Sequence, residues 1–86
     1  MEPEAAFGEV LRELRRRAGL SQEALALEAG IQRNYVSLIE RGLNSPSLRV
    51  LFKLAQTLQV STAELMELTE KKLGMHGKRA RSRAAH

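Results

Sequence analysis

The chain has 86 residues, which is enough for one small domain whose free energy of unfolding is about 3 to 5 kcal/mol. Hydrophobic residues make up 43% of the chain and aromatic residues 3%, and because the apolar residues are mainly Leu and Ala, the composition favours an all-α fold. The net charge is +4 and there is no Cys, which excludes a disulfide framework, thiol catalysis and Cys-ligated zinc.

The first predicted helix begins at Pro3, because proline is favoured in a first helical turn and the carboxylates of Glu2 and Glu4 oppose the helix dipole. Gly19 can adopt the left-handed conformation that ends a helix, and the basic residues just before it suit a C-terminal end. The apolar residues recur at the three- and four-residue spacing of a buried helix face: Phe7, Val10, Leu11, Leu14 and Ala18.

Two shorter helices are predicted on either side of Gly30. Ser21 is a natural N-cap for a helix from Gln22 to about Ala29, which Gly30 ends. The next helix runs from about Gln32 to Arg41, and Gly42 closes it. The residues expected to point inward are Leu25, Ala26 and Ala29 from the first of the two and Val36 and Ile39 from the second.

A loop is predicted over residues 42–47, which are rich in Gly, Asn, Ser and Pro. Either Ser45 or Ser47 caps the helix that follows, and the sequence leaves the choice between them open. The apolar positions of this fourth helix are Leu48, Leu51, Leu54, Ala55 and Leu58.

A fifth helix is predicted from Ser61, because Ser61 and Glu64 form a capping box, and Gly74 stops this helix. Its apolar residues cover a broad arc, and such an arc usually needs a second surface to cover it. The sequence therefore predicts a homodimer interface at Leu65, Met66 and Leu68.

Residues 75–86 have no hydrophobic periodicity and are predicted to form a disordered basic tail after a domain of residues 1–74. Residues 71–86 contain six of the 14 Lys and Arg and none of the ten Glu. One interpretation of the tail is a solubilising end; the other is a sequence-independent attraction to DNA, about 0.9 units of salt slope per phosphate neutralised. Both interpretations concern Lys78, Arg79, Arg81 and Arg83.

Groups suited to catalysis or metal binding are scarce. The two histidines, His76 and His86, lie in the predicted tail, far from any packed pair of glutamates or serines with which they could act. No enzyme activity, metal or cofactor is therefore expected. No small-molecule ligand is expected either. Since no apolar run approaches the roughly 18 residues of a membrane span and the acidic N-terminus is unlike a signal peptide, we expect a cytoplasmic protein.

The second and third predicted helices, joined by a turn that contains Gly30, form a helix-turn-helix arrangement, in which the second helix of the pair lies in the DNA major groove. Over about residues 7–68 the sequence resembles the phage-repressor family of Cro and lambda repressor, which implies a five-helix lambda-repressor-like bundle. The segments that carry the resemblance are Gly19 to Glu23, Ala29 to Ile31, Tyr35 to Ser37, Ile39 to Gly42 and Pro46 to Leu48.

The third predicted helix supplies the candidates for contact with bases, on the face opposite Val36 and Ile39. Arg33 has the fork that fits guanine, Asn34 can pair with adenine, and Ser37 can serve either base. Of the three, we expect Arg33 to contribute most to base recognition. Leu38 and Arg41 share this face.

The resemblance also implies roles around the reading helix. Gln22 corresponds to a phosphate contact, and Arg15 and Glu40 correspond to an internal salt bridge between the first and third helices. Tyr35 has two open interpretations: its hydroxyl contacts a phosphate, or its ring covers the neck between helices. Further candidates for the DNA backbone are Arg41, Asn44 and Ser45.

The resemblance implies a transcriptional regulator that binds double-stranded DNA at a palindromic operator as a homodimer, and the small layout is similar to controller proteins of restriction-modification systems. Because the chain ends soon after this domain, no sensory domain is expected, and control would come from concentration, dimerisation or another protein. Cro-like phage regulators share the layout. The alternative is an antitoxin or other protein-interaction module that binds DNA and a partner protein.

Overall fold

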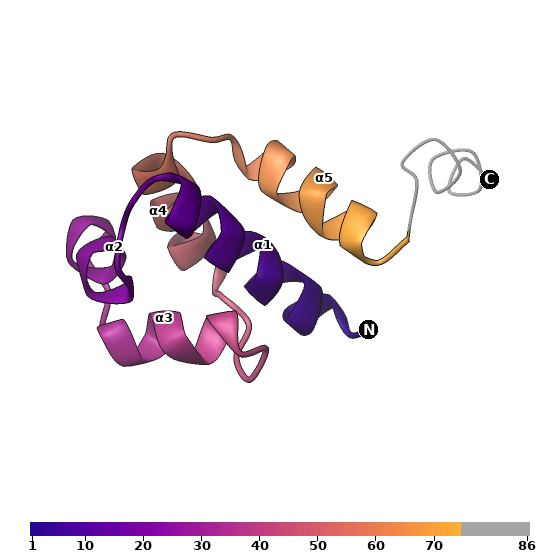
Figure 1. The fold of residues 1–86 in the computed structure, drawn as a ribbon, viewed down its shortest axis with the longest axis horizontal. Coiled ribbons are helices and arrows are strands. Elements are labelled where there is room, and N and C mark those ends of the chain that lie inside the picture. The colour runs from indigo at the N-terminus through magenta and orange to yellow at the C-terminus, as the bar shows by residue number, and fades with distance from the viewer. Residues whose placement is uncertain (75–86) are drawn as a thin grey trace.

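The computed structural model describes residues 1–74, and all regular structure in that range is helical. The all-α, five-helix architecture predicted from the sequence is therefore confirmed, whereas the predicted tail, residues 75–86, lies outside the described residues. Figure 1 shows α1 crossing the middle of the molecule, with α5 beside it and with α2 and α3 at the other end. The helices are α1 (Pro3–Arg17), α2 (Gln22–Ala29), α3 (Arg33–Glu40), α4 (Leu48–Leu58) and α5 (Thr62–Lys72).

Three of the five helices begin at a serine cap. The hydroxyl oxygens of Ser21, Ser47 and Ser61 accept hydrogen bonds from the backbone N–H groups three residues later, at 3.0, 3.2 and 2.9 Å. Each cap satisfies a donor that the first helical turn leaves without a partner. Ser47 is thus the cap of α4, and the other candidate, Ser45, instead donates its hydroxyl hydrogen to Glu4 at 3.3 Å.

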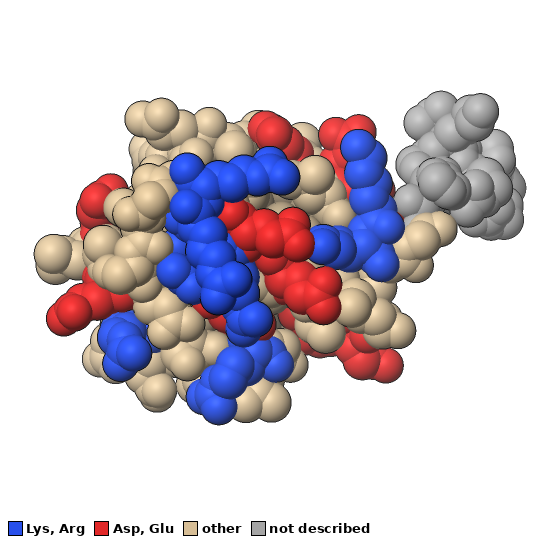
Figure 2. All heavy atoms as spheres, in the orientation of Figure 1, with Lys and Arg blue, Asp and Glu red and all other residues tan. Residues whose placement is uncertain are grey.

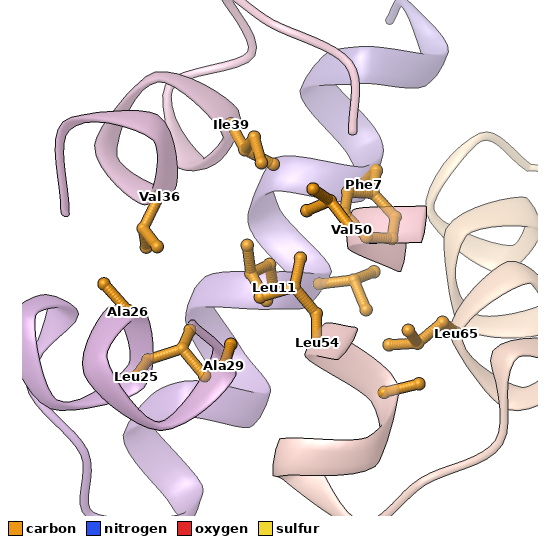
Figure 3. Packing of buried hydrophobic residues seen from close by; sticks show 12 residues of the cluster. Phe7, Leu11, Leu25, Ala26, Ala29, Val36, Ile39, Val50, Leu54 and Leu65 are labelled. Atoms are coloured by element: carbon orange, nitrogen blue, oxygen red, sulfur yellow. The ribbon is translucent and has the colours of Figure 1, made fainter. Parts of the chain in front are cut away.

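A single hydrophobic core joins all five helices (Figure 3). The prediction for α4 was wrong at its first residue: Leu48 is 71% exposed, and Val50 is buried instead. The buried face of α4 follows Val50 and Leu54, and a residue two positions before Val50 points to the opposite side of a helix. The core residues are Phe7, Val10, Leu11, Leu25, Ala26, Ala29, Val36, Ile39, Val50, Leu54, Ala55 and Leu65.

Gly8, in the middle of α1, permits a very close approach between α1 and the end of α3. A Cβ atom at this position would lie 2.4 Å from the carbonyl oxygen of Ile39 and 2.6 Å from that of Glu40. Both neighbours are backbone atoms, which cannot rotate away. The absence of a side chain at Gly8 therefore sets the distance between the two helices.

Gly30 produces the turn between α2 and α3. Its φ of 73° lies in the left-handed region, which glycine adopts without steric cost. Two backbone hydrogen bonds close the end of α2: the N–H of Ile31 donates to Ala26 at 2.9 Å, and the N–H of Gly30 donates to Leu27 at 3.3 Å. The chain then enters α3 three residues later, so the sequence-derived position of this turn is correct.

Within residues 1–74, none of the helices combines the length and the apolar character that a bilayer crossing requires.

Candidate nucleic-acid interface

The helix α3 has one face fixed in the core and another open to solvent. Val36 and Ile39 are fully buried, which prevents α3 from rotating about its axis. Arg33 and Asn34, the first two residues of α3, are exposed. Ser37 is half-buried on the same helix. The three predicted base-contacting residues therefore lie together on a helix whose orientation the core sets.

The segment after α3 contains the predicted contacts to the DNA backbone. Arg41 and Asn44 are exposed there, and the N–H groups of Leu43 and Asn44 donate to the carbonyl oxygen of Leu38 at 2.9 and 3.3 Å. Ser45 is exposed too, but its hydroxyl is bonded to the carboxylate of Glu4. A carboxylate at this place repels a phosphate, so Ser45 is a weaker candidate than Arg41 or Asn44.

Tyr35 fastens the loop between α3 and α4. Its hydroxyl donates to the carbonyl oxygen of Ser45 at 3.3 Å and accepts a hydrogen bond from the N–H of Ser47 at 3.2 Å. A phenol has one hydrogen to donate, and here Ser45 receives it. Of the two interpretations of Tyr35, this geometry agrees with the structural one, because the hydroxyl has no hydrogen left for a phosphate.

Arg15 and Glu40 form a buried, two-pronged ion pair between α1 and α3. Arg15 Nε donates to Glu40 Oε2 at 2.6 Å, and Arg15 Nη2 donates to Glu40 Oε1 at 3.0 Å. The remaining edge of the guanidinium is also used, since Nη1 donates to the carbonyl oxygen of Leu20 at 2.9 Å. The pair implied by the resemblance is thus present, and it ties both helices to the turn that precedes α2.

The carboxylate of Glu40 accepts one further hydrogen bond and has one further ion-pair partner. Gln22 Nε2, at the start of α2, donates to Glu40 Oε1 at 3.0 Å. Arg12 Nε lies 3.5 Å from the same oxygen. Sequence reasoning missed Arg12; its spacing of three residues before Arg15, one helical turn, was the signal that could have placed both on the Glu40 side of α1.

Burial opposes the ionised form of Glu40 and acts to raise its pKa. The hydrogen bonds from Arg15 and Gln22, together with the positive charges of Arg15 and Arg12, act in the opposite direction and hold the pKa of Glu40 below its usual value. The hydrogen bond to Glu40 likewise raises the pKa of Arg15. Both groups are therefore ionised at neutral pH, and Glu40 has a structural role.

The three residues predicted to form the dimer interface differ in their exposure to solvent. Leu65 is fully buried in the core of its own chain and Leu68 packs against that core, so Leu65 has no surface to offer a partner. Met66 is 39% exposed. Two further exposed apolar residues lie on α4, where Leu48 and Phe52, 55% exposed, are one turn apart. These α4 residues were expected in the core or were not singled out at all.

We call the exposed apolar residues Leu48 and Phe52 of α4, together with Met66 of α5, the α4–α5 surface. Leu51 and Met66 line one groove between the helices, and Phe52 and Thr62 line another. Thr62 and Met66 lie one turn apart on α5, so the two grooves border neighbouring turns of that helix.

Basic side chains gather on the face shown in Figure 2, where a band of Lys and Arg runs over α1 towards α3. Acidic side chains lie beside this band, towards α5. An exposed ion-pair link joins α5 to α1, where Lys72 Nζ lies 2.6 Å from Glu13 Oε2 and 3.6 Å from Glu9 Oε1. The hydrogen bond from Lys72 lowers the pKa of Glu13. The tail cations and both histidines lie outside the described residues.

The described part of the chain brings no three His, Cys, Asp or Glu side chains together as a metal site.

Comparison with known proteins places the helix-turn-helix family on residues 11–65. The restriction-modification controller protein C.AhdI from Aeromonas hydrophila is 47% identical, with a TM-score of 0.70 over 72% of this chain and 94% of that one. Control protein C.BamHI of Bacillus amyloliquefaciens is 38% identical over 64 residues, 73% of this chain and 79% of that protein. The transcriptional regulator SlrR of Bacillus subtilis is 41% identical over 62 residues, 71% of this chain but 41% of SlrR, so this chain spans less than half of that relative.

Proposed function

The chain belongs to the helix-turn-helix family and is a transcriptional regulator of that type, and from this premise we propose that it binds a palindromic operator as a homodimer. The observation that carries the proposal is the geometry of α3. Its inner face is locked by Val36 and Ile39, while Arg33 and Asn34 extend from its first turn. A helix held in this way can enter the major groove and present donors and acceptors to base edges.

Contacts to phosphates fix the register of this helix on the duplex. Gln22 supports such a role, because one hydrogen of its amide is used by Glu40 and the other remains free for a phosphate. Arg41 and Asn44 supply further donors at the end of α3. The tail, residues 75–86, adds sequence-independent attraction in this proposal.

The second copy packs against the α4–α5 surface. Exposure of the apolar side chains of Leu48, Phe52 and Met66 to water is unfavourable. In this proposal the same surface of a second copy covers them, since a twofold axis brings identical surfaces into contact. The same axis would set two α3 helices about 34 Å apart, one turn of DNA. A palindromic operator follows from this symmetry.

The similarity to C.AhdI and C.BamHI favours a controller of a restriction-modification system as the subtype. The antitoxin alternative requires apolar anchors in the tail, and after Met75 the sequence provides essentially none. The proposal also includes a cytoplasmic location and the absence of an enzyme activity.

Selection of bound sequences from random duplex DNA tests the readout. We expect a palindromic consensus whose base preference at one position per half-site is lost in Arg33→Ala, at a cost of about 1 to 3 kcal/mol. Arg17→Ala removes the same charge from α1 on the side that faces α5, and should leave the preference intact. An unchanged consensus with Arg33→Ala would contradict the assignment.

Sedimentation of Phe52→Glu and Met66→Glu tests the dimer. Each variant should shift the protein to a monomer while its thermal unfolding temperature changes little, because both side chains already contact solvent. Leu27→Glu, an equally drastic change at an exposed position of α2, is the matched control and should remain dimeric. Dimers that persist in both α4–α5 variants would rule this surface out.

A further inference from the structure

Arg12 and Gln22 meet at a single atom. Gln22 Nε2 donates to Glu40 Oε1 at 3.0 Å, and Arg12 Nε lies 3.5 Å from that same oxygen. The side chain of Glu40 is fully buried, whereas that of Arg12 is 40% exposed. One buried carboxylate therefore holds two surface side chains, one from α1 and one from α2, next to each other.

The side chains around Glu40 carry an excess positive charge, which favours the binding of an anion. Arg15 neutralises Glu40 through two hydrogen bonds and uses its remaining edge on Leu20, so that pair is closed. Arg12 then adds a positive charge that this carboxylate does not need. A guanidinium has five N–H groups; the closest approach of Arg12 to Glu40 is through Nε, and within residues 1–74 its Nη groups make no hydrogen bond.

We propose that Arg12 and Gln22 together bind one phosphate of the DNA backbone, held in position by Glu40. This inference rests on the proposed function. The Nη groups of Arg12 and the free amide hydrogen of Gln22 supply the donors, and the planar guanidinium suits two adjacent phosphate oxygens. Because the ion pair with Glu40 at 3.5 Å already restrains Arg12, less side-chain entropy is lost on binding than for an unattached surface arginine.

The position of the pair fits this role. Glu40 is the last residue of α3, so the proposed phosphate site lies beside the C-terminal end of the reading helix, next to exposed Arg41. The basic band over α1 in Figure 2 extends towards this end of the molecule. Contacts at that end would hold α3 at a fixed depth in the groove without reading bases.

The test is the salt dependence of duplex affinity, with the full-length chain, the selected operator and a scrambled duplex. Arg12→Gln should reduce the slope of log affinity against log salt by about 0.9, the value for one phosphate, and weaken binding to both duplexes by the same factor. The base preference should not change. Arg17→Gln is the matched control, because it removes the same charge from the same helix on the side that faces α5, and it should alter the slope less.

A double-mutant comparison tests whether the two residues share one phosphate. Arg12→Gln combined with Gln22→Ala should weaken binding by clearly less than the product of the two single effects. Thermal unfolding of each variant shows whether folding is intact, and Arg12→Lys, which keeps the charge, should retain most of the slope.

An unchanged slope in Arg12→Gln, or an equal loss in Arg17→Gln, would overturn the inference while leaving the proposed function in place. A wild-type protein with no duplex affinity above background would overturn both. Independent effects of Arg12→Gln and Gln22→Ala would refute the shared phosphate.

Discussion

Replacement of Gly8 by alanine tests whether the contact between α1 and α3 controls the stability of the domain. In an isolated helix this change is favourable by about 1 kcal/mol, because alanine is the better helix former. In the folded protein the new Cβ would lie 2.4 Å from the carbonyl oxygen of Ile39, which is 0.6 Å short of the 3.0 Å below which real Cβ atoms essentially never approach. A second carbonyl, that of Glu40, lies at 2.6 Å, so α1 must move away from α3.

Movement of α1 costs more than the helix gains. Overpacking a core costs about 1 to 3 kcal/mol, and the upper end of about 3 kcal/mol applies here, because the new Cβ meets two backbone carbonyls and the shift also strains the short bonds between Arg15 and Glu40. After the helical gain is subtracted, we expect a net loss of about 2 kcal/mol. For a domain with about 3 to 5 kcal/mol in total, this is close to half of the free energy of unfolding.

Urea unfolding followed by circular dichroism measures this loss. With a slope near 1 kcal/mol per molar urea, the low end for small proteins, the midpoint of Gly8→Ala should fall by about 2 M. Gly19→Ala is the control: its φ is +75° and a Cβ there meets nothing within 4 Å, so it reports the conformational cost alone, about 1 kcal/mol. A Gly8→Ala variant as stable as the wild type would refute the packing argument.

Three further outcomes follow from named contacts. Because the pKa of Glu40 is lowered in the folded state, ionised Glu40 contributes its full stabilisation above the usual pKa of about 4.3, and this contribution is lost as the pH falls through the folded-state pKa. The thermal unfolding temperature should therefore fall only in that acidic range. An unfolding temperature that does not change with pH there would contradict this reasoning. Ser47→Ala removes the cap bond to Val50 and should lower the free energy of unfolding by about 1 kcal/mol in urea, whereas no change would mean that water replaces the cap. Tyr35→Phe should cost about 1 kcal/mol, since two loop bonds are lost; if it weakens DNA binding without any effect on unfolding, the phosphate interpretation of Tyr35 is correct instead.

The helices and the exposed face of α3 could be predicted because their signals are local. Ser21 and Ser61 cap helices through bonds to residues three positions away, and Gly30 ends α2 with its own backbone conformation. The alternation of buried Val36 and Ile39 with exposed Arg33 is likewise contained within one helix. Such signals depend on residues that are neighbours in the sequence, so they survive without knowledge of the tertiary structure.

The errors concern surfaces whose environment is set by distant segments. Leu48 and Leu65 are both apolar and both recur at helical spacing, yet one is 71% exposed and the other is fully buried. The difference arises from where α4 and α5 pack, which spacing along a single helix does not encode. The choice between Ser45 and Ser47 has the same origin, because Glu4, 41 residues away, binds the first of them.

Glu40 links the packing of α1 and α3 to the phosphate contact that we propose for Arg12. The short approach that Gly8 permits brings the end of α3 against α1, and only there can one carboxylate contact Arg12, Arg15 and Gln22. Arg15 faces inward and completes the fold, whereas Arg12 and Gln22 face outward and would meet the DNA. A perturbation of Gly8 should therefore lower DNA affinity even under conditions where the domain remains folded, since the displaced Glu40 no longer holds both outward side chains together. If Gly8→Ala, measured well below its unfolding midpoint, binds the operator with wild-type affinity and salt slope, the link between the packing of α1 and the phosphate contact is wrong.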